Sequence, residues 1–348
     1  MPYMLEFALI LVGFVLLVVG ADKLVDSASS IAARFGMPDR VIGLTIVAVG
    51  TSLPELVVSV TSGVGGHADM VFGNVVGSCL ANILLILGIS ALISPIPLSR
   101  STRRFEIPAS IASVALLLVF ANTGGRISLI EGVAMLALFA AFMVRSAVVG
   151  TRAKRAQDMS DVEPLSAADA RVLAASGEPA AGGAGYPDLD LADVKVKQRN
   201  ILVDLLIIAV SIALLKVGAD FVVNNSVAVA SGLGVSERVI GITVVALGTC
   251  LPELVTGVVA ALKGNIEIAV GNVIGSNVAN VLLVIGAPAL FSAVPYDAAY
   301  NVDFVLQIAF TAALLLCALR KPRNRVGRMD GIAFTFLYVA YIVASLLR

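Results

Sequence analysis

Long apolar segments, separated by short polar ones, make up nearly the whole chain. A helix needs about 20 mostly apolar residues to cross a bilayer, and ten segments of the sequence are long enough. They are residues 5–24, 38–62, 69–94, 104–121, 127–148, 200–222, 237–262, 266–293, 299–319 and 329–347. The pattern therefore predicts an all-α integral membrane protein with ten transmembrane helices. The first segment lacks a basic leader and a cleavage site, so we expect a retained helix rather than a signal peptide.

One long polar stretch, residues 150–199, divides these segments into two groups of five. It is rich in Ala, Gly, Asp and Ser and poor in large apolar residues, a composition typical of chains that do not form a packed core. We therefore expect residues 1–149 to form a first five-helix membrane domain and residues 200–348 to form a second. Residues 150–199 are predicted to be a disordered linker between them.

The composition agrees with a membrane location and narrows the classes of function. Hydrophobic residues make up 59% of the chain and charged residues 14%, and the mean hydropathy is +0.99, which excludes an ordinary soluble domain. The formal net charge is zero, so no basic surface suggests a nucleic-acid partner. The three cysteines lie in predicted helices without the spacing of a metal site. We expect no enzymatic activity and no bound cofactor.

The two halves carry the same sequence motifs in the same order. Residues 50–56, Gly-Thr-Ser-Leu-Pro-Glu-Leu, recur as residues 248–254, Gly-Thr-Cys-Leu-Pro-Glu-Leu, 198 positions further along the chain. At the same offset, Gly-Asn-Val-Val-Gly-Ser at residues 73–78 recurs as Gly-Asn-Val-Ile-Gly-Ser at residues 271–276. The chain is therefore a duplicated half.

Lysine and arginine are concentrated in the loops that follow the third, fifth and ninth predicted helices, and such loops are usually cytoplasmic. These residues are Arg100, Arg103, Arg104, Arg145, Arg152, Lys154, Arg155, Arg320, Lys321, Arg323, Arg325 and Arg328. The distribution predicts a cytoplasmic 150–199 linker and both termini outside. Because each half has an odd number of helices, the halves have opposite orientations, as in the inverted repeats of many secondary transporters. Short loops suit a multi-pass protein of the plasma membrane, which in a bacterium is the inner membrane.

Each copy of the repeated motif places a glutamate, Glu55 or Glu253, inside a predicted membrane helix. A buried ionised carboxylate is costly unless it is paired or binds a cation, so such residues are usually functional. A proline precedes each glutamate, and because its ring collides with the carbonyl four residues earlier, we expect both helices to break near the bilayer midplane. Backbone carbonyls around residues 48–51 and 246–249 would then be available as cation ligands.

Polar residues on neighbouring predicted helices add further oxygen ligands. They are Asn74, Ser78 and Asn82 in the first half and Asn272, Ser276 and Asn280 in the second. A spacing of four residues places each trio on one helix face. Carboxylates, hydroxyls, carboxamides and carbonyls suit Ca²⁺, whereas the sequence offers no imidazole or thiolate cluster for zinc or copper. Such polar residues can also serve only to hold helices together, but two facing glutamates would repel each other unless a cation or proton intervened.

On these motifs the chain resembles the cation/calcium exchanger superfamily, and most closely its prokaryotic sodium/calcium antiporters. The resemblance covers the chain outside residues 150–199 and rests on the repeats that span residues 50–82 and 248–280. It implies ten transmembrane helices as two inverted repeats, alternating access by sliding of two helices over a fixed core, and exchange of Ca²⁺ for Na⁺ with extrusion of Ca²⁺.

The resemblance also implies a role for each candidate site residue. Glu55 and Glu253 would bind Ca²⁺ directly and share in Na⁺ binding. The other implied ligands are the carbonyls of Thr51 and Thr249 for Ca²⁺, the carbonyls of Ala48 and Ala246 for Na⁺, the hydroxyls of Ser52, Ser78 and Ser276 for Na⁺, and the carboxamide of Asn82 at the centre.

Two positions depart from the pattern of the relatives. Asn280 stands where many sodium/calcium exchangers carry an aspartate, and Cys250 replaces a serine ligand with a softer thiol. Both stay in the predicted site, but they leave open a coupling to H⁺, or one assisted by K⁺. A passive cation channel is a weaker alternative, because a pore usually has an axis normal to the membrane. We expect the lipid bilayer, Ca²⁺ and Na⁺ as the binding partners and a functional monomer.

Overall fold

The computed structural model describes residues 3–161, 200–234, 246–320 and 325–347. These residues form a bundle of helices with four two-residue strands in the loops. Eight helical segments of the described part are long and apolar enough to cross a membrane, and one bent pair of helices raises the number to nine. The eight are Met4–Phe35, Ala68–Ile93, Thr102–Gly124, Leu129–Val149, Ile201–Gly232, Ile266–Leu290, Ala298–Leu319 and Arg328–Ser345. The protein is therefore an all-helical membrane protein, as predicted.

The bent pair and the seventh predicted helix account for the remaining segments. Helices Asp39–Thr51 and Leu53–Val64 meet at an angle of 45°, which is the break expected before Pro54. Of the seventh helix, 237–262, the structure describes only the part from residue 246 onward. Residues 235–245 lie outside the described residues, so the count of ten spans stays a prediction.

The elements of the first half are, in order, α1 (Met4–Phe35), α2 (Asp39–Ile42), η1 (Gly43–Val47), α3 (Ala48–Thr51), α4 (Leu53–Val64), α5 (Ala68–Leu80), η2 (Ala81–Ile86), α6 (Leu87–Ile93), β1 (Ile96–Pro97), η3 (Thr102–Glu106), α7 (Ile107–Gly124), β2 (Arg126–Ile127) and α8 (Leu129–Asp161). Those of the second half are α10 (Ile201–Gly232), α12 (Ala246–Thr249), α13 (Leu251–Leu262), α14 (Ile266–Ala279), η5 (Asn280–Val284), η6 (Pro288–Leu290), β3 (Val294–Pro295), η7 (Ala298–Tyr300), α15 (Asn301–Leu319), β4 (Arg325–Val326) and α16 (Arg328–Leu347). Segments η1, η2, η3 and η5 are π-helical, a conformation frequent at functional sites.

Helix α8 is longer than the sequence predicts. It continues through residues 150–161, where we expected a disordered linker to begin. The expectation is wrong for this stretch because it weighed polarity alone: residues 152–157, Arg-Ala-Lys-Arg-Ala-Gln, are all good helix formers. The rest of the predicted linker, residues 162–199, lies outside the described residues.

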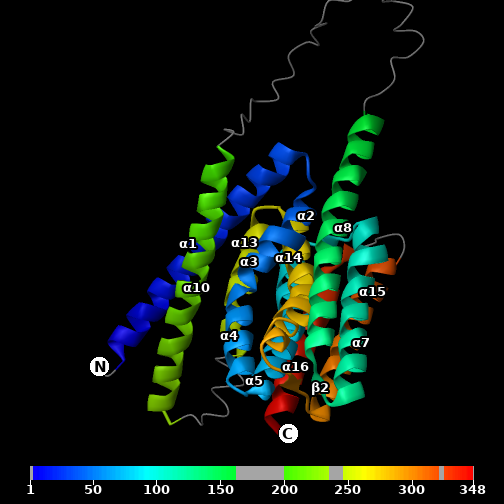
Figure 1. Cartoon of the computed structure of the whole chain (residues 1–348). Coiled ribbons are helices and arrows are strands. Elements are labelled where there is room, and N and C mark those ends of the chain that lie inside the picture. Colours follow the sequence, from blue (N-terminus) through cyan, green and yellow to red (C-terminus); the bar gives the residue numbers. More distant parts are fainter. Residues whose placement is uncertain (1–2, 162–199, 235–245, 321–324, 348) are drawn as a thin grey trace, which may run out of the picture.

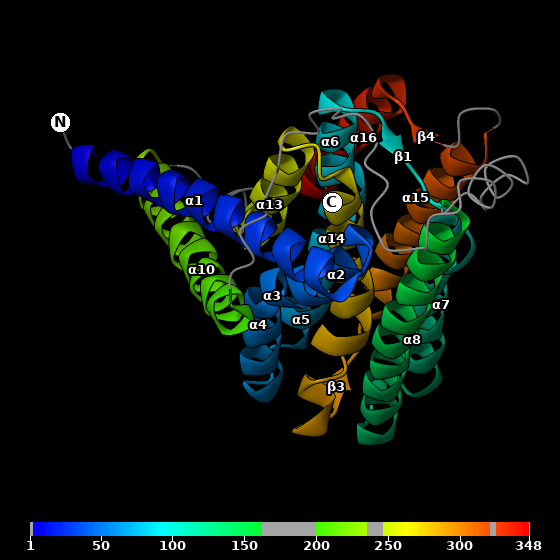
Figure 2. The same ribbon diagram turned by 90° about the horizontal axis from the view of Figure 1, so that it is seen from above.

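The helices fall into three groups in space. Helices α1 and α10 pack along each other at one side of the molecule, and α7, α8 and α15 lie at the opposite side (Figures 1 and 2). The broken helices, α5 and α14 lie between these groups (Figure 1). Helix α14 and its continuation are central, since 94% of the most apolar window of Ile266–Leu290 is buried, whereas that of α1 is 22% buried. Helix α14 is therefore enclosed by the other helices.

Glycines allow the two long helices α1 and α10 to approach closely. A Cβ atom added to Gly13 would lie 2.7 Å from the carbonyl oxygen of Gly218, and one added to Gly218 would lie 2.8 Å from the carbonyl oxygen of Gly13. Small residues at helix contacts are typical of membrane proteins, where close backbone packing replaces the hydrophobic driving force. This pair is thus held by a narrow contact between backbones.

Each short strand pairs with a strand of the other half of the chain. Strands β1 and β4 are antiparallel, with Ile96 opposite Val326, and strands β2 and β3 are antiparallel, with Ile127 opposite Val294. The loops at these points therefore join the first half of the sequence to the second.

Candidate cation-binding site

The site is built around two interruptions of helical structure at the repeated motif. Ser52 separates α3 from α4 with φ −84° and ψ 5°, and Cys250 separates α12 from α13 with φ −85° and ψ 0°. In each case the new helix carries a proline and a glutamate in its first turn. The positive end of the helix dipole at this turn favours a carboxylate. The predicted breaks are confirmed, and each one presents a glutamate at a helix N-terminus.

Glycine precedes each break because another helix leaves no room for a side chain. A Cβ atom on Gly50 would lie 2.5 Å from Cδ1 of Ile212, and one on Gly248 would collide with Cγ2 of Val223. Both neighbours belong to α10, which therefore packs against the two breaks at once.

The two glutamates are fully enclosed by protein. Glu55 is 0% exposed and Glu253 is 1% exposed. Ser52 Oγ donates a hydrogen bond of 3.1 Å to Oε1 of Glu253, so the break of the first half contacts the carboxylate of the second. Within the described residues, both carboxylate oxygens of Glu55 and Oε2 of Glu253 have no hydrogen-bond partner. Buried carboxylate oxygens without donors require a compensating positive charge.

Two asparagines fix the backbone behind the glutamates. Asn74 Nδ2 donates to the carbonyl oxygen of Glu55 at 3.3 Å, and Asn272 Nδ2 donates to that of Glu253 at 3.5 Å. Asn272 Oδ1 also accepts a hydrogen bond of 3.1 Å from Thr51 Oγ1. These contacts support the structural interpretation of Asn74 and Asn272, in which they hold helices together and position the ligands.

The carbonyl of Ala48 is not freed by the break, contrary to expectation. Its oxygen accepts the N–H of Ser52 at 3.1 Å and also receives the hydroxyls of Thr51 and Ser276 at 3.4 Å each. The reason is positional, because Pro54 removes the helical donor for the carbonyl of Gly50, not for that of Ala48. This oxygen already faces three donors for its two lone pairs. These contacts do not test whether it also binds a cation, so the role of Ala48 as a ligand stays a prediction. Ser276 does reach this carbonyl from α14.

Cys250 points into the same region from the second break. Its thiol donates to Oγ of Ser78 at 3.4 Å, and Oγ1 of Thr249 lies 3.9 Å from its sulfur. Cys250 and Ser78 are both buried. The residue that departs from the pattern of the relatives therefore contacts an expected ligand.

Asn82 and Asn280 lie at the beginning of the π-helical segments η2 and η5. Both side chains are 0% exposed. In the described part of the chain, neither amide atom of Asn280 has a partner, nor does Oδ1 of Asn82. Asn82 Nδ2 donates to Oδ1 of Asn277 at 2.9 Å. The centre of the molecule thus contains unpaired amide oxygens in addition to unpaired carboxylates.

Sequence reasoning missed two buried amides at this centre. Asn277 donates to the carbonyl of Cys79 at 3.3 Å, and these residues are 198 positions apart, the offset of the repeat. Gln307 on α15 is 0% exposed, and no described residue pairs with either of its amide atoms. The sequence indicates both residues only as polar residues within apolar segments. Neither has a polar residue at the equivalent position of the other half, so the comparison of the repeats does not single them out.

Most of the predicted ligands are thus brought together by direct contacts. Hydrogen bonds join Ser52 to Glu253, Ser276 to Ala48 and Cys250 to Ser78. Ala246 begins α12, and the structure describes only its backbone. Among the described residues, no group of three or more His, Cys, Asp or Glu residues is suited to a metal ion. The donor set is therefore two carboxylates with neutral oxygens, which fits a hard cation.

A cavity of about 550 Å³ leads toward this site, lined among others by Asn74, Gly77 and Thr249. Its lining also includes Asp69, Asp303 and Ser345, near the end of the molecule that carries the C-terminus (Figure 1). The side chains of Thr249 and Asn74 thus connect the buried site to an opening at this end.

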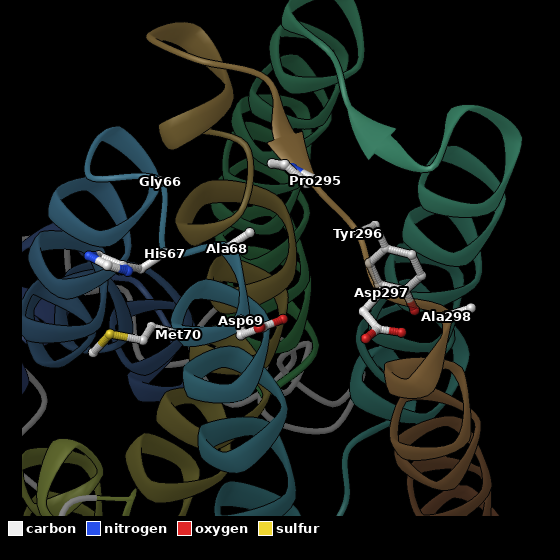
Figure 3. A pocket seen from close by; sticks show the side chains of 9 residues that line it. All are labelled: Gly66, His67, Ala68, Asp69, Met70, Pro295, Tyr296, Asp297 and Ala298. Atoms are coloured by element: carbon white, nitrogen blue, oxygen red, sulfur yellow. The ribbon is translucent and has the colours of Figure 1, made fainter.

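Acidic residues surround the opening. A neighbouring hollow of about 620 Å³ is lined by His67, Asp69 and Asp297, and the two aspartates come from its opposite sides (Figure 3). Burial, followed by the charges of Asp303 and Asp297, raises the pKa of Tyr296 to about 12. Such a negative potential concentrates cations at the mouth.

Fold and site together define a polytopic membrane protein with two buried glutamates at the breaks of two helices. The family model described as sodium/calcium exchanger protein matches residues 5–148 and 203–347. The chain belongs to the sodium/calcium exchanger family, as the repeated motifs suggested, and thus to a family of cation/Ca²⁺ antiporters rather than of enzymes.

Individual relatives match over nearly their whole length. The chain is 32% identical to the inner membrane protein YrbG of Escherichia coli (strain K12) over 97% of this chain and 96% of that protein. It is 31% identical to the sodium/calcium exchanger MaX1 of Methanosarcina acetivorans over 97% of each. A solved structure of the sodium-calcium exchanger NCX_Mj, soaked with 10 mM Na⁺ and 10 mM Sr²⁺, superposes with a TM-score of 0.76 at 28% identity, covering 98% of both chains.

Proposed function

We propose that this protein exchanges Ca²⁺ for Na⁺ across a membrane by alternating access. The observation that carries the proposal is the pair of enclosed glutamates. The carboxylate oxygens of Glu55 have no hydrogen-bond partner among the described residues, and Glu253 is contacted by Ser52 of the other half. Two carboxylates balance the charge of one Ca²⁺, and the neighbouring neutral oxygens complete a shell of six to eight ligands.

The proposed ligands are those implied by the resemblance. Glu55 and Glu253 bind Ca²⁺ together with the carbonyls of Thr51 and Thr249. The proposed Na⁺ ligands are the carbonyls of Ala48 and Ala246, the hydroxyls of Ser52, Ser78 and Ser276, the carboxamides of Asn82 and Asn280, and the region of Cys250. Because both ions use the glutamates, binding of Na⁺ displaces Ca²⁺.

Shared carboxylates also explain why transport is an exchange. An empty site would carry two uncompensated charges in a low-dielectric interior, which costs several kcal/mol per ion. The site therefore crosses between its two open states only when it is loaded with cations. Ca²⁺ moves in one direction only if Na⁺ returns in the other.

An inverted repeat provides the two open states. Three features support it: each strand pairs with the other half, Asn74 and Asn272 make equivalent bonds to the two glutamate carbonyls, and Cys79 meets its own repeat partner Asn277. The moving part is the pair α1 and α10, which packs against both breaks and lies at one side of the bundle (Figure 2). We propose that it slides over the remaining helices and that one chain suffices for transport.

The proposed location is a bacterial inner membrane with both termini outside. The distribution of Arg and Lys supports this orientation, and one relative is named an inner membrane protein of Escherichia coli. In this orientation the acidic opening near Asp69 faces outward, and Na⁺ entering down its gradient drives Ca²⁺ out of the cytoplasm.

Coupling to H⁺ is the second candidate, and Cys250 favours it. The thiol of Cys250 contacts Ser78, a proposed Na⁺ ligand, and sulfur is a poor ligand for Na⁺. A carboxylate pair exchanges protons as readily as Na⁺, and a K⁺-assisted reaction is a variant of the same scheme.

The test is Ca²⁺ uptake into proteoliposomes that contain the purified protein. Gradients of Na⁺, K⁺ and H⁺ are imposed one at a time, with protein-free liposomes as the control. We expect uptake only when internal Na⁺ is high. Uptake driven by a proton gradient alone would replace Na⁺ with H⁺ as the coupling ion, and uptake without any counter-gradient would identify a channel and contradict the exchanger.

A further inference from the structure

An apolar groove of about 400 Å³ runs between α7 and α8 at the side of the molecule opposite α1. Ala109 and Ala112 of α7 and Ala141 of α8 line it, and these small side chains leave the space between the helices unfilled. It extends from Phe105 of η3 along α7 to Leu116, about 16 Å at the rise of a helix. That length matches one leaflet of the hydrocarbon core, about 15 Å.

An arginine closes one end of the groove. Arg145 of α8 lines the groove, and its guanidinium carbon lies 3.4 Å from the centroid of the Phe105 ring. Phe105 stacks in turn on Phe142, with ring centroids 5.7 Å apart. A guanidinium on an aromatic face is held in place while its edge keeps N–H donors for an oxyanion. The arginine is thus preorganised.

Basic residues lie at this end of the groove. Arg104 directly precedes Phe105 and is exposed, and the acidic neighbour Glu106 is paired with Arg40. Among the described residues that line the groove, none is acidic, and Arg145 has no carboxylate within salt-bridge distance in the described part of the protein. A basic pocket between transmembrane helices is the usual binding site of an anionic lipid headgroup.

The floor of the groove belongs to the cation site. Val278 of α14 and Leu282 of η5 line it, on the same segment as Asn277 and Asn280. An occupant of the groove therefore packs against the back of the helix that carries these amides.

We propose that the groove binds one acyl chain of an anionic phospholipid, with the phosphate held by Arg145. The apolar length accepts the chain, and the arginine selects the headgroup. The lipid comes from the leaflet at the basic ends of α7 and α8.

The natural absence of tryptophan allows a direct test. Leu138 lines the groove, so Leu138→Trp places the only tryptophan of the full-length protein there. Its fluorescence is measured in vesicles that contain increasing fractions of brominated phosphatidylglycerol or brominated phosphatidylcholine, which quench a tryptophan in contact. We expect the anionic lipid to bind about fivefold more tightly than the zwitterionic one.

Two controls separate this site from general lipid contact. Leu206→Trp places the reporter on an exposed position of α10, where we expect equal quenching by both lipids. In the Leu138→Trp background, Arg145→Gln should abolish the preference, whereas Arg126→Gln, in strand β2, should keep it.

Equal quenching of Leu138→Trp by the two lipids would overturn the proposal, and this comparison keeps all native arginines in place. Quenching by neither lipid would also overturn it, because it would mean that another protein surface, such as a second copy of the chain, covers the groove. The readout is binding, so it does not depend on which ion is transported.

Discussion

At the scale of single residues, the two buried glutamates differ in their surroundings. Glu253 accepts a hydrogen bond from Ser52, whereas neither carboxylate oxygen of Glu55 has a partner in the described part of the chain. A buried carboxylate without donors depends most strongly on a bound cation. In the proposed exchanger, Glu55 is therefore the carboxylate that depends more on the bound cation.

We predict that Glu55→Gln and Glu253→Gln each reduce Ca²⁺ uptake by about a hundredfold or more, since breaking a buried charge pair costs about 3 kcal/mol or more. Glutamine keeps the shape, and removing an uncompensated charge should leave the thermal unfolding temperature of the cation-free protein unchanged or higher. Uptake and thermal unfolding are measured on the same preparations. Glu267→Gln, at an exposed position of α14, is the matched control. Normal uptake in either glutamate variant would refute the site.

Cys250→Ser tests the coupling ion at one atom. Replacing sulfur with oxygen beside Ser78 should lower the Na⁺ concentration for half-maximal Ca²⁺ flux by roughly two- to tenfold, because Na⁺ prefers oxygen ligands. Flux is measured over a range of Na⁺ concentrations. Cys317→Ser is the control, because this buried thiol lies near the C-terminal end of α15 and contacts Asp330 of α16. An unchanged Na⁺ dependence in the Cys250 variant would remove this residue from the Na⁺ site.

The duplication determines which site residues can be predicted from the sequence. Glu55, Ser52 and their counterparts can be identified because their motif occurs twice, and the helix breaks can be predicted because each motif contains a proline. The contact of Ser52 with the glutamate of the other half did not follow, because it depends on how the two breaks cross. Asn277 and Gln307 were missed for the same reason, since only packing brings an isolated amide to the centre.

At the scale of elements, a lysine fastens α13 to α1. Lys263, directly after α13, lies 2.6 Å from Oδ1 of Asp22 and 2.5 Å from Oδ1 of Asp26. Partial burial opposes the charge of Lys263, but the two aspartates outweigh it and raise its pKa. The repeat position of Lys263 in the first half is Gly65, so the other end of the molecule has no equivalent lysine. The contact secures α1, one of the two helices that we propose to move, at one end only.

We predict that Lys263→Met loosens the contact between α1 and α13. Exposed ion pairs contribute about 0–1 kcal/mol each, so loss of two pairs raises the population of the separated state by up to roughly thirtyfold. The measurement is the rate of thiol labelling of Ser27→Cys, a buried position on α1. Lys216→Met is the control, because Lys216 pairs with Asp220 four residues away on α10 itself. Equal labelling rates in both variants would show that Lys263 does not secure α1.

At the scale of the whole molecule, the sequence indicated the spans and the duplication but not the packing. Apolar length predicts a membrane helix reliably because the bilayer has a fixed thickness. Apolar length does not indicate which helices are central, and only the structure shows that α14 is buried. Apolar length also does not predict ion pairs between distant residues. An example is the buried pair of Arg40 and Glu106, whose Nε and Oε1 atoms are 3.0 Å apart.

The paired strands have a consequence for chain continuity. Both strand pairs join opposite halves, and neither involves the segment 162–199 between them. The strand pairs thus hold the two halves together at both ends of the bundle, independently of the covalent connection. We predict that residues 1–161 and 200–348, expressed as separate polypeptides in one cell, assemble and co-purify through an affinity tag on either piece. Recovery of the tagged piece alone would mean that the halves associate only when the peptide chain connects them, and that the strand pairs do not suffice.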